Sequence, residues 1–424
     1  MTPSRRHARR VAAATFVSVL LSIVVATSVL ALFWGTARRL TSSGESWAQP
    51  HSVAATGEGG AVVVYQEGLE SVSSVYARRT TDAGVTWLAR VRLSPADAGN
   101  AYFPAVAASG NSVDAVWSQG PNCPMDCRVY HRRSIDGGGT WTVARAISGL
   151  ATTDGAWTAR VARRGQQVTV TWSTSESARI RARTSLDGGS TWGPLQTIGT
   201  HTNPFHPSGD AQATVTIGSG VTYVVFYRDH PRIVVRRSLD QGATWQPPIL
   251  LATAFNGFDV VASGSRAIVA YGAGAGATGS VWVAERHTAD AGVTWSPAAA
   301  ISPPTANESL FPSLAYRAGR WVATFARSLD PELTDISDAR AAGFVETPSL
   351  AVFLRESTNG GSTWGTTFRA SPASIVSAYP SGSAIAGGRH LVAFVGMPDE
   401  TTASYVYVRP GFWSCAACDE AGAR

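Results

Sequence analysis

The chain has 424 residues, of which 15% are charged, and 35 basic against 29 acidic residues give a formal net charge of +6. Six basic residues precede the first acidic residue, Glu45; they are Arg5, Arg6, Arg9, Arg10, Arg38 and Arg39. The remainder therefore carries 29 charges of each sign. A fold that binds nucleic acid needs a basic excess, so the composition argues against a nucleic-acid partner.

The N-terminal segment predicts a membrane anchor. An Arg-rich flank (1–10) precedes an uncharged run over residues 11–35. About 20 apolar residues span a bilayer, whereas a cleaved signal peptide has an apolar region of about 7–15 residues. We therefore predict a transmembrane signal anchor over 11–35, with cleavage after Gly35-Thr36-Ala37 as the alternative. Four arginines before the run and two after it favour a cytoplasmic N-terminus. The rest of the chain is then extracytoplasmic, and it is secreted if the anchor is cleaved.

One eight-residue motif recurs six times and organises the rest of the chain. Its consensus is Ser/Thr-x-Asp-x-Gly-x-Thr-Trp, and Asn359 replaces Asp in the last copy. The copies are Thr80-TDAGVT-Trp87, Ser134-IDGGGT-Trp141, Ser185-LDGGST-Trp192, Ser238-LDQGAT-Trp245, Thr288-ADAGVT-Trp295 and Ser357-TNGGST-Trp364. Successive tryptophans lie 54, 51, 53, 50 and 69 residues apart. A period of about 50 residues indicates an array of similar structural units.

The motif, called the box below, has the chemistry of a tight turn between two strands. Asp and Asn oxygens bond to nearby backbone N–H groups, and Gly supplies a positive φ. Thr and Trp then favour an extended strand. Each box should therefore join two strands of one sheet.

The segments between boxes predict an all-β fold. Each holds two further short strand patterns, as in Gln167-VTVTW, bounded by Gly-rich turns. First-strand patterns begin near His51, Phe103, Trp157, Asp210, Phe258, Phe311 and Tyr379. We predict seven units over residues 51–410, six being the alternative, and a Cys-containing tail over 411–424. The last unit has no box. A linker over 36–50, in which Ala37-RRLTSSGES-Trp47 is similar to a degenerate box, should supply its missing strand near Trp47 and close the ring.

The six boxes resemble the Asp-box, or bacterial neuraminidase repeat, of sialidase-like β-propellers. The resemblance covers about residues 40–410 and implies a propeller whose boxes lie on the face opposite the ligand. The box residues are then structural: Asp82, Trp87, Asp136, Trp141, Asp187, Trp192, Asp240, Trp245, Asp290, Trp295, Asn359 and Trp364.

A sialidase of this family needs three arginines to clamp a carboxylate, a Tyr nucleophile activated by Glu, and an Asp acid/base. The resemblance suggests Tyr379, Glu308 and Asp210 for the catalytic roles. The family's Arg-Ile-Pro motif is missing, and the nearest string is Arg232-Ile233-Val234. Candidate ligand-binding residues are Arg160, Arg228, Arg317, Arg327, Tyr102, Phe311 and Asp259. His206 and His230 are expected to be hydrogen-bonded loop residues.

Two further features concern loops. The long interval in the sixth unit contains an acidic insertion, 327–349, with Asp330, Glu332, Asp335, Asp338 and Glu346. It should hang over the ligand face as a lid, a cation-binding loop or a solvated insertion. The close pairs Cys123/Cys127 and Cys415/Cys418 predict local disulfides, since an extracytoplasmic location permits them. A four-Cys zinc site, free thiols or bridges between the pairs are the alternatives.

Three functions are compatible with the sequence. The first is a membrane-anchored propeller that binds a glycan, peptide or protein ligand in its central funnel. The second is an exo-acting sialidase-type glycoside hydrolase, and the third is an assembly factor for a membrane complex. No cofactor motif or metal-ligand spacing is present. A fold alone does not establish an activity.

Overall fold

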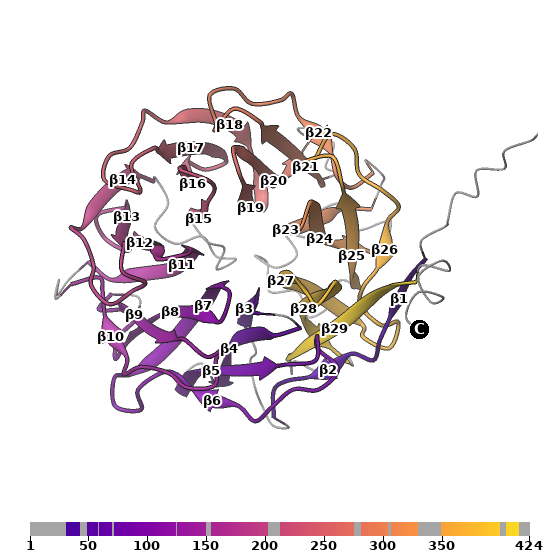
Figure 1. Cartoon of the computed structure of the whole chain (residues 1–424), viewed down its shortest axis with the longest axis horizontal. Helices are drawn as coiled ribbons and strands as arrows, with labels where there is room; N and C mark the ends of the chain where they lie inside the picture. The colour runs from indigo at the N-terminus through magenta and orange to yellow at the C-terminus, as the bar shows by residue number, and fades with distance from the viewer. Residues whose placement is uncertain are drawn as a thin grey trace, which may run out of the picture. The chain divides into compact units, whose positions relative to one another are not determined.

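The computed structural model describes residues 31–42, 49–57, 59–69, 72–123, 125–149, 154–201, 213–274, 281–303, 307–329, 349–398 and 404–414. Leu32–Trp413 forms one compact unit. Within it, seven antiparallel sheets surround a common axis (Figure 1). The described residues form strands and no helix. The prediction of a seven-bladed, all-β propeller is confirmed.

Each blade is one sheet whose strands follow one another from the axis outward. The first blade contains β3 (Gln49–Ala55), β4 (Ala61–Leu69), β5 (Val72–Thr80) and β6 (Val91–Arg92). The second contains β7 (Asn100–Ser109), β8 (Ser112–Gly120), β9 (Arg128–Ser134) and β10 (Arg145–Ala146). The third contains β11 (Ala156–Arg164), β12 (Gln167–Thr174), β13 (Arg179–Ser185) and β14 (Gln196–Thr200). The fourth blade contains β15 (Ala213–Ile217), β16 (Thr222–Asp229), β17 (Arg232–Ser238) and β18 (Ile249–Thr253). The fifth contains β19 (Phe255–Ser263), β20 (Arg266–Gly274), β21 (Val281–Thr288) and β22 (Ala299–Ala300). The sixth contains β23 (Ser309–Arg317), β24 (Arg320–Ser328), β25 (Leu350–Ser357) and β26 (Phe368–Arg369).

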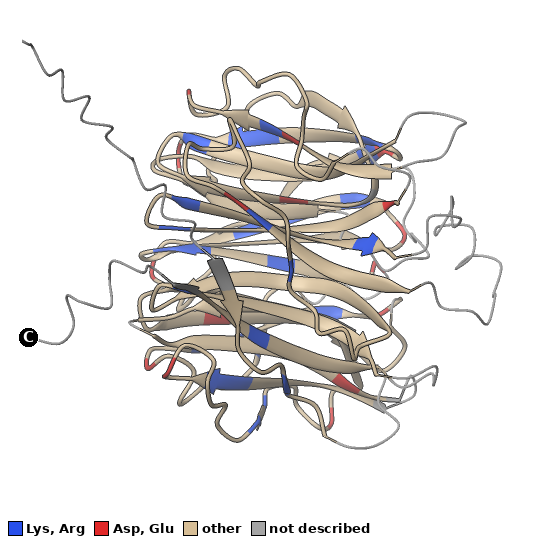
Figure 2. Ribbon diagram, turned by 90° about the vertical axis from the view of Figure 1, so that its right-hand side faces the viewer, with Lys and Arg blue, Asp and Glu red and all other residues tan. Residues whose placement is uncertain are grey.

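The antiparallel order gives the ring two distinct faces. Innermost strands begin, and second strands end, on one side, as the pairing of Asn100 with Gly120 illustrates. The turns between first and second strands, and the boxes between third and fourth strands, lie on the other side. We call these sides the entry face and the box face. Figure 2 views the ring from the side, with charges of both signs distributed over the sheets.

The seventh blade is closed by the start of the chain. It contains β27 (Ser377–Ala386), β28 (Arg389–Met397) and β29 (Tyr405–Ser414), and β1 (Ala31–Trp34) and β2 (Arg38–Arg39) pair with the outer edge of β29. Arg38 faces Val408 and Arg39 faces Tyr407. The closing strand thus lies earlier than the predicted position near Trp47, a residue outside the described range. Because this pairing is antiparallel, β1 begins at the box face, beside the end of β29.

The pairing also shortens the segment available for an anchor. Residues 31–34, the end of the predicted span 11–35, belong to a strand of the ring. The rest of that span, residues 11–30, lies outside the described residues. In the described part of the chain, no helix has the length and hydropathy needed to cross a bilayer.

The hydrophobic core is divided among the seven junctions between neighbouring blades. At the first junction, for example, Val62 and Val64 of β4 pack in one cluster with Ala115 and Trp117 of β8. Each sheet has a neighbour on both faces, so its second strand is buried on both sides. Such strands read as continuous apolar runs rather than alternating patterns. Residues 61–65 accordingly have no exposed surface.

The boxes form the predicted turns. Ser134 Oγ donates to Asp136 Oδ1 at 2.7 Å and accepts from the amide of Gly138 at 2.8 Å. Asp136 Oδ1 also accepts from the amide of Thr140 at 2.8 Å, and corresponding bonds recur in the other five boxes. The hydrogen bonds that Asp136 accepts lower its pKa to about 2, and the bond from the Thr140 amide has the largest effect. Trp141 packs against the cluster between the first and second blades. The box Asp and Trp therefore take part in the turn and in the packing between blades.

Candidate functional site

Irregular innermost strands shape the entry face. Six of the seven carry a β-bulge close to their first residues. At three of these bulges a residue with a β-carbon has a positive φ: 51° at Phe103, 52° at Thr158 and 53° at Phe311. Such a conformation costs about 1–3 kcal/mol and occurs mainly at functional sites. Bulges also redirect side chains, so these irregularities affect which side chains point toward the entry face.

Aromatic side chains gather at these bulges. The Trp157 ring lies 5.4 Å from the Tyr102 ring and 4.8 Å, edge to face, from the Phe103 ring. On the other side of the ring, Phe311 lies 5.8 Å from Tyr379. All five side chains are half-buried. We call them the aromatic rim; it includes the predicted ligand-binding residues Tyr102 and Phe311.

Asp259 joins three blades at mid-height in the ring. Its carboxylate accepts hydrogen bonds from the amides of Val260 and Leu314, both at 2.8 Å, and from Thr214 Oγ1 at 3.4 Å. Burial raises the pKa of Asp259 to about 6, although these bonds and the positive charge of Arg160 oppose the rise. Arg160, half-buried on β11, donates to its neighbour's carbonyl, that of Ala159, at 3.0 Å. The two predicted residues thus interact electrostatically across the ring.

The other arginine candidates do not form one clamp with Arg160. Arg228 is exposed at the end of β16 and pairs with Asp229 at 3.4 Å. Arg317 ends β23 and donates to the carbonyl of Ile385 at 3.0 Å. That position is on the box face, roughly 25 Å along the strand from the entry face at about 3.3 Å per residue. A carboxylate clamp on the entry face therefore cannot include Arg317.

The candidates Glu308, Arg327 and Tyr379 lie on the entry face of the sixth and seventh blades. The Arg327 guanidinium lies over the rings of Phe325 and Phe353, on the side facing the fifth blade. Glu308 is buried directly before β23. Arg327, at the end of β24, donates from Nε to Ser309 Oγ at 3.4 Å. Burial and then the charge of Arg355 lower the pKa of Arg327, whose buried Nη2 has no hydrogen-bond partner among the described residues. Tyr379 lies in the same apolar cluster as Phe311.

Other sequence candidates lie elsewhere or outside the described residues. Asp210 and His206 fall in the undescribed range 202–212. His230 follows β16 on the entry face, with its ring 5.0 Å from that of Tyr227.

The acidic insertion leaves the ring on the entry face, as its place in the sequence predicted. Ser328 pairs with Leu350, and the amide of Leu329 donates to the carbonyl of Ser349 at 2.8 Å. These bonds fix the two ends of the insertion. Its five acidic residues lie outside the described residues. In the described ranges, no three His, Cys, Asp or Glu side chains are arranged to hold a metal ion.

A disulfide joins Cys123 and Cys127 in the loop between β8 and β9, on the entry face. Cys415 and Cys418 lie outside the described residues. Asp126 in the same loop accepts from the amide of Asn122 at 2.9 Å. The predicted local disulfide is therefore present for the first cysteine pair.

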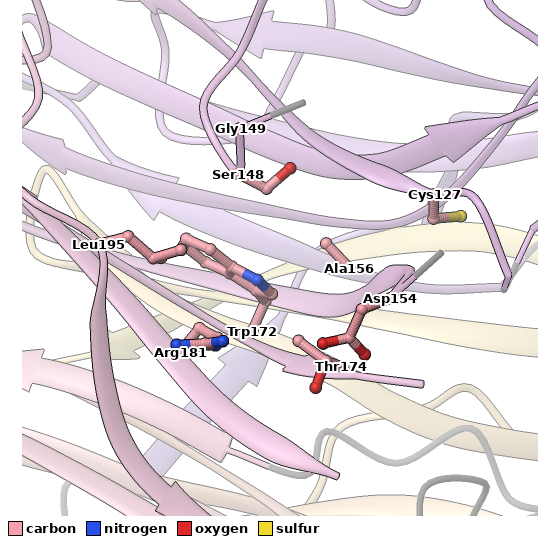
Figure 3. Close-up of a pocket in the computed structure, with 9 residues that line it drawn as sticks. All are labelled: Cys127, Ser148, Gly149, Asp154, Ala156, Trp172, Thr174, Arg181 and Leu195. Carbon is pink, nitrogen blue, oxygen red and sulfur yellow. The ribbon is translucent and has the colours of Figure 1, made fainter. Parts of the chain in front are cut away.

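A small pocket lies beside this loop (Figure 3). It is lined by Cys127, Ser148, Gly149, Asp154, Ala156, Trp172, Thr174, Arg181 and Leu195. Asp154 accepts from the amides of Glu176 and Ser177 at 3.1 and 3.0 Å. Arg181 donates to Thr197 Oγ1 at 2.5 Å. Both charged groups thus already have partners within the blade.

Sequence reasoning missed three features of the entry face: Phe103, Trp157 and the pocket. Phe103 and Trp157 were visible as first residues of strand patterns. Their packing depends on the bulges, because a register shift moves a side chain from one side of a strand to the other. Nothing local in the sequence marks such a shift.

Comparison with known proteins agrees with this architecture. A family model described as a BNR repeat-like domain matches residues 14–259. No curated protein sequence matches the chain. A protein of unknown function from Dyadobacter fermentans has 12% identity and a TM-score of 0.55, over 90% of this chain and 99% of that one. At this identity, the likeness shows the fold alone.

Two sialidase structures are also similar. A mutant NanB sialidase from Streptococcus pneumoniae has 10% identity and a TM-score of 0.48, over 68% of this chain and 67% of that one. The Trypanosoma rangeli sialidase has 13% identity and a TM-score of 0.46, over 86% of this chain. The match spans 55% of the T. rangeli chain, about half its length. Similarity at this level carries no argument about activity.

Proposed function

The chain belongs to the family of BNR repeat-like domains, and we propose that it is a binding propeller that recognises a glycan on its entry face. The aromatic rim is the observation that carries this proposal. Tyr and Trp offer a rigid apolar ring with a polar edge, which suits a ligand that combines C–H faces with hydroxyl groups. Binding sites commonly join aromatic walls to a few fixed polar groups. Arg160 and Asp259 supply such groups deeper in the ring.

The Trp157 ring is the first part of the rim to test. We expect Trp157→Ala to weaken glycan binding by about tenfold or more, as for a central aromatic anchor. The full chain in nanodiscs would be applied to an array of glycans and peptidoglycan fragments, and the affinity for the best ligand compared between variants.

Leu250→Ala is the matched control, since Leu250 is exposed on an outermost strand and should leave affinity unchanged. Thermal unfolding of both variants separates lost binding from lost structure. A well-folded Trp157→Ala variant with undiminished affinity would remove the rim from the ligand site.

A sialidase-type hydrolase is the second candidate, favoured by one arrangement. Arg327 at the root of the acidic insertion donates to Ser309, the residue after the buried Glu308, and Tyr379 opens the seventh blade on the same face. An Arg, a Tyr and a Glu on one face are residue types that hydrolysis of a carboxylate-bearing sugar would require.

A fluorogenic sialoside assay separates the two candidates. We expect no turnover by the wild-type chain, because Arg317 lies on the opposite face and the exposed Arg228 pairs with Asp229, so the described candidates do not form the three-arginine clamp. Turnover by the wild type that disappears in Tyr379→Phe would establish the hydrolase instead. Arg228→Ala serves as the control in that case, since it lies outside this group.

We also propose that residues 11–30 anchor the propeller in the cytoplasmic membrane, with the ring outside the cell. These twenty residues carry no charge and follow four arginines, which is typical of a signal anchor with a cytoplasmic N-terminus. Resistance of the full chain to carbonate extraction from membranes would support the anchor. Recovery of a soluble chain lacking this segment would show that it is cleaved.

A further inference from the structure

The box face carries a set of exposed apolar side chains. Ile135, Leu186 and Leu239 each follow the first residue of a box and are 67%, 59% and 52% exposed. Val85 and Val293 precede the Thr of their boxes and are also exposed. Two more exposed residues follow a box Trp within two positions, namely Leu88 and Val143.

The repeat places these side chains at one level. Each box joins the third and fourth strands of its blade, so equivalent box positions recur around the ring at the same height. Phe33 of β1, where the chain enters the ring on this side, is exposed as well. By contrast, the exposed large apolar residues described on the entry face are Met125 and Leu329. Soluble proteins rarely expose apolar side chains in such an array.

The charged groups of the box face have both signs, with ionised box carboxylates and exposed arginines such as Arg164. Each box carboxylate is already bonded within its own turn; Asp187, for example, accepts from the amides of Ser190 and Thr191 at 3.0 and 2.9 Å. Arg164 is exposed beside the turn between β11 and β12 on this face. Basic side chains at such a surface are attracted to anionic lipids.

The side on which the chain enters the ring favours one occupant for this surface. The uncharged run that we propose as an anchor ends at Leu30, and β1 begins at Ala31 on the box face. No linker therefore separates the anchor from the ring. A propeller tethered in this way meets the membrane with its box face.

We propose that the box face rests on the headgroup region of a phospholipid bilayer, with its exposed apolar residues inserted and the entry face directed away from the membrane. This proposal rests on the anchor proposed above. It assigns the two faces different partners: lipid at the boxes and the soluble or cell-wall ligand at the aromatic rim. Apolar side chains in such a surface lie about 5–10 Å within the headgroup boundary.

Hydroxyl-radical footprinting of the full chain in nanodiscs of mixed zwitterionic and anionic phospholipids tests the contact. A variant with a 30-residue Gly/Ser linker inserted after Leu30 allows the ring to leave the membrane. We expect Ile135, Leu186 and Leu239 to remain about fivefold less labelled than Leu329, an exposed aliphatic residue of the entry face with similar reactivity, because they are inserted among headgroups. Adding Ile135→Ser, Leu186→Ser, Leu239→Ser and Val293→Ser should raise the labelling of Leu88, which remains on this face, to that of Leu329.

The control is the linker variant with Met125→Ser and Leu250→Ser, which should keep the protection and retains Leu329 as the reference. Equal labelling of both faces in the linker variant would overturn the proposal while leaving the anchor intact. Failure of the full chain to enter nanodiscs would overturn both, and ligand binding is measured separately on the array. The same labelling is measured on the chain in detergent. If the chain is a dimer there, and the box face is protected until the four Ser substitutions are made, this face binds a second copy of the chain instead.

Discussion

Replacing Gly138 by Ala should lower the free energy of unfolding by about 3 kcal/mol. Gly138 has a φ of 87°, and a β-carbon there would lie 2.7 Å from Cγ2 of Val62 in the preceding blade. Positive φ costs a residue with a β-carbon about 1–2 kcal/mol, and overpacking adds about 1–3 kcal/mol. Urea unfolding followed by tryptophan fluorescence measures the loss as a shift of the midpoint.

Gly110→Ala is the matched control for this substitution. Gly110 also has a positive φ, 59°, but no atom lies within 4 Å of the added carbon. Gly110→Ala should therefore lower the free energy of unfolding only by the cost of the positive φ, about 1 kcal/mol. Equal losses in the two variants would contradict the packing of the box against its neighbour.

Replacing Glu285 by Gln should stabilise the protein at alkaline pH. Glu285 has no exposed surface and lies 3.2 Å from Nδ1 of His287. Burial raises its pKa from 4.5 to about 8, and burial followed by the charge of Arg266 lowers the pKa of His287. A protonated Glu285 can donate to a neutral His287, and Gln reproduces that bond.

The raised pKa gives this effect a definite direction. The contribution of Glu285 to stability is complete below pH 4.5 and is lost as the pH rises through about 8. At about 1.4 kcal/mol per pKa unit, Glu285→Gln should be more stable than the wild type by about 3–5 kcal/mol near pH 9 and nearly equal to it near pH 5. Urea midpoints from pH 5 to pH 9 test this.

The exposed Glu176, changed to Gln, provides the control and should show no such dependence on pH. Parallel stability curves for Glu285→Gln and the wild type would mean that Glu285 is ionised at neutral pH. The cause of its burial is visible in the structure, where Gly361 of the next box lies against it: a β-carbon on that glycine would be 3.4 Å from Oε2 of Glu285.

The turns and the number of blades could be predicted because their causes are local. The bonds from Asp136 to Thr140 and from Ser134 to Gly138 span four residues, and each recurs wherever the motif recurs. The positive φ of the box glycine is likewise a property of one residue. A strongly periodic sequence therefore determines its repeating unit.

The functional surfaces depend on contacts that the repeat does not encode. Tyr379 and Phe311 were singled out in the sequence, but their packing against each other depends on bulges in two blades. Arg317 was grouped with Arg327 although the strand direction places them on opposite faces. The sequence shows which residues have suitable side chains. Only their positions in the folded ring decide which of these side chains can act together.

The amino-acid sequence by itself determined the box turns, the strand pattern and the division into seven blades, since hydrogen bonds and backbone preferences within a few residues suffice for these. Only the tertiary structure decided that Ala31–Trp34 and Arg38–Arg39 close the ring on β29, that the box of one blade buries Glu285 of another, and that the apolar box residues share one face. These features arise from contacts between residues tens to hundreds of positions apart. Such contacts form only when the sheets are arranged around a common axis.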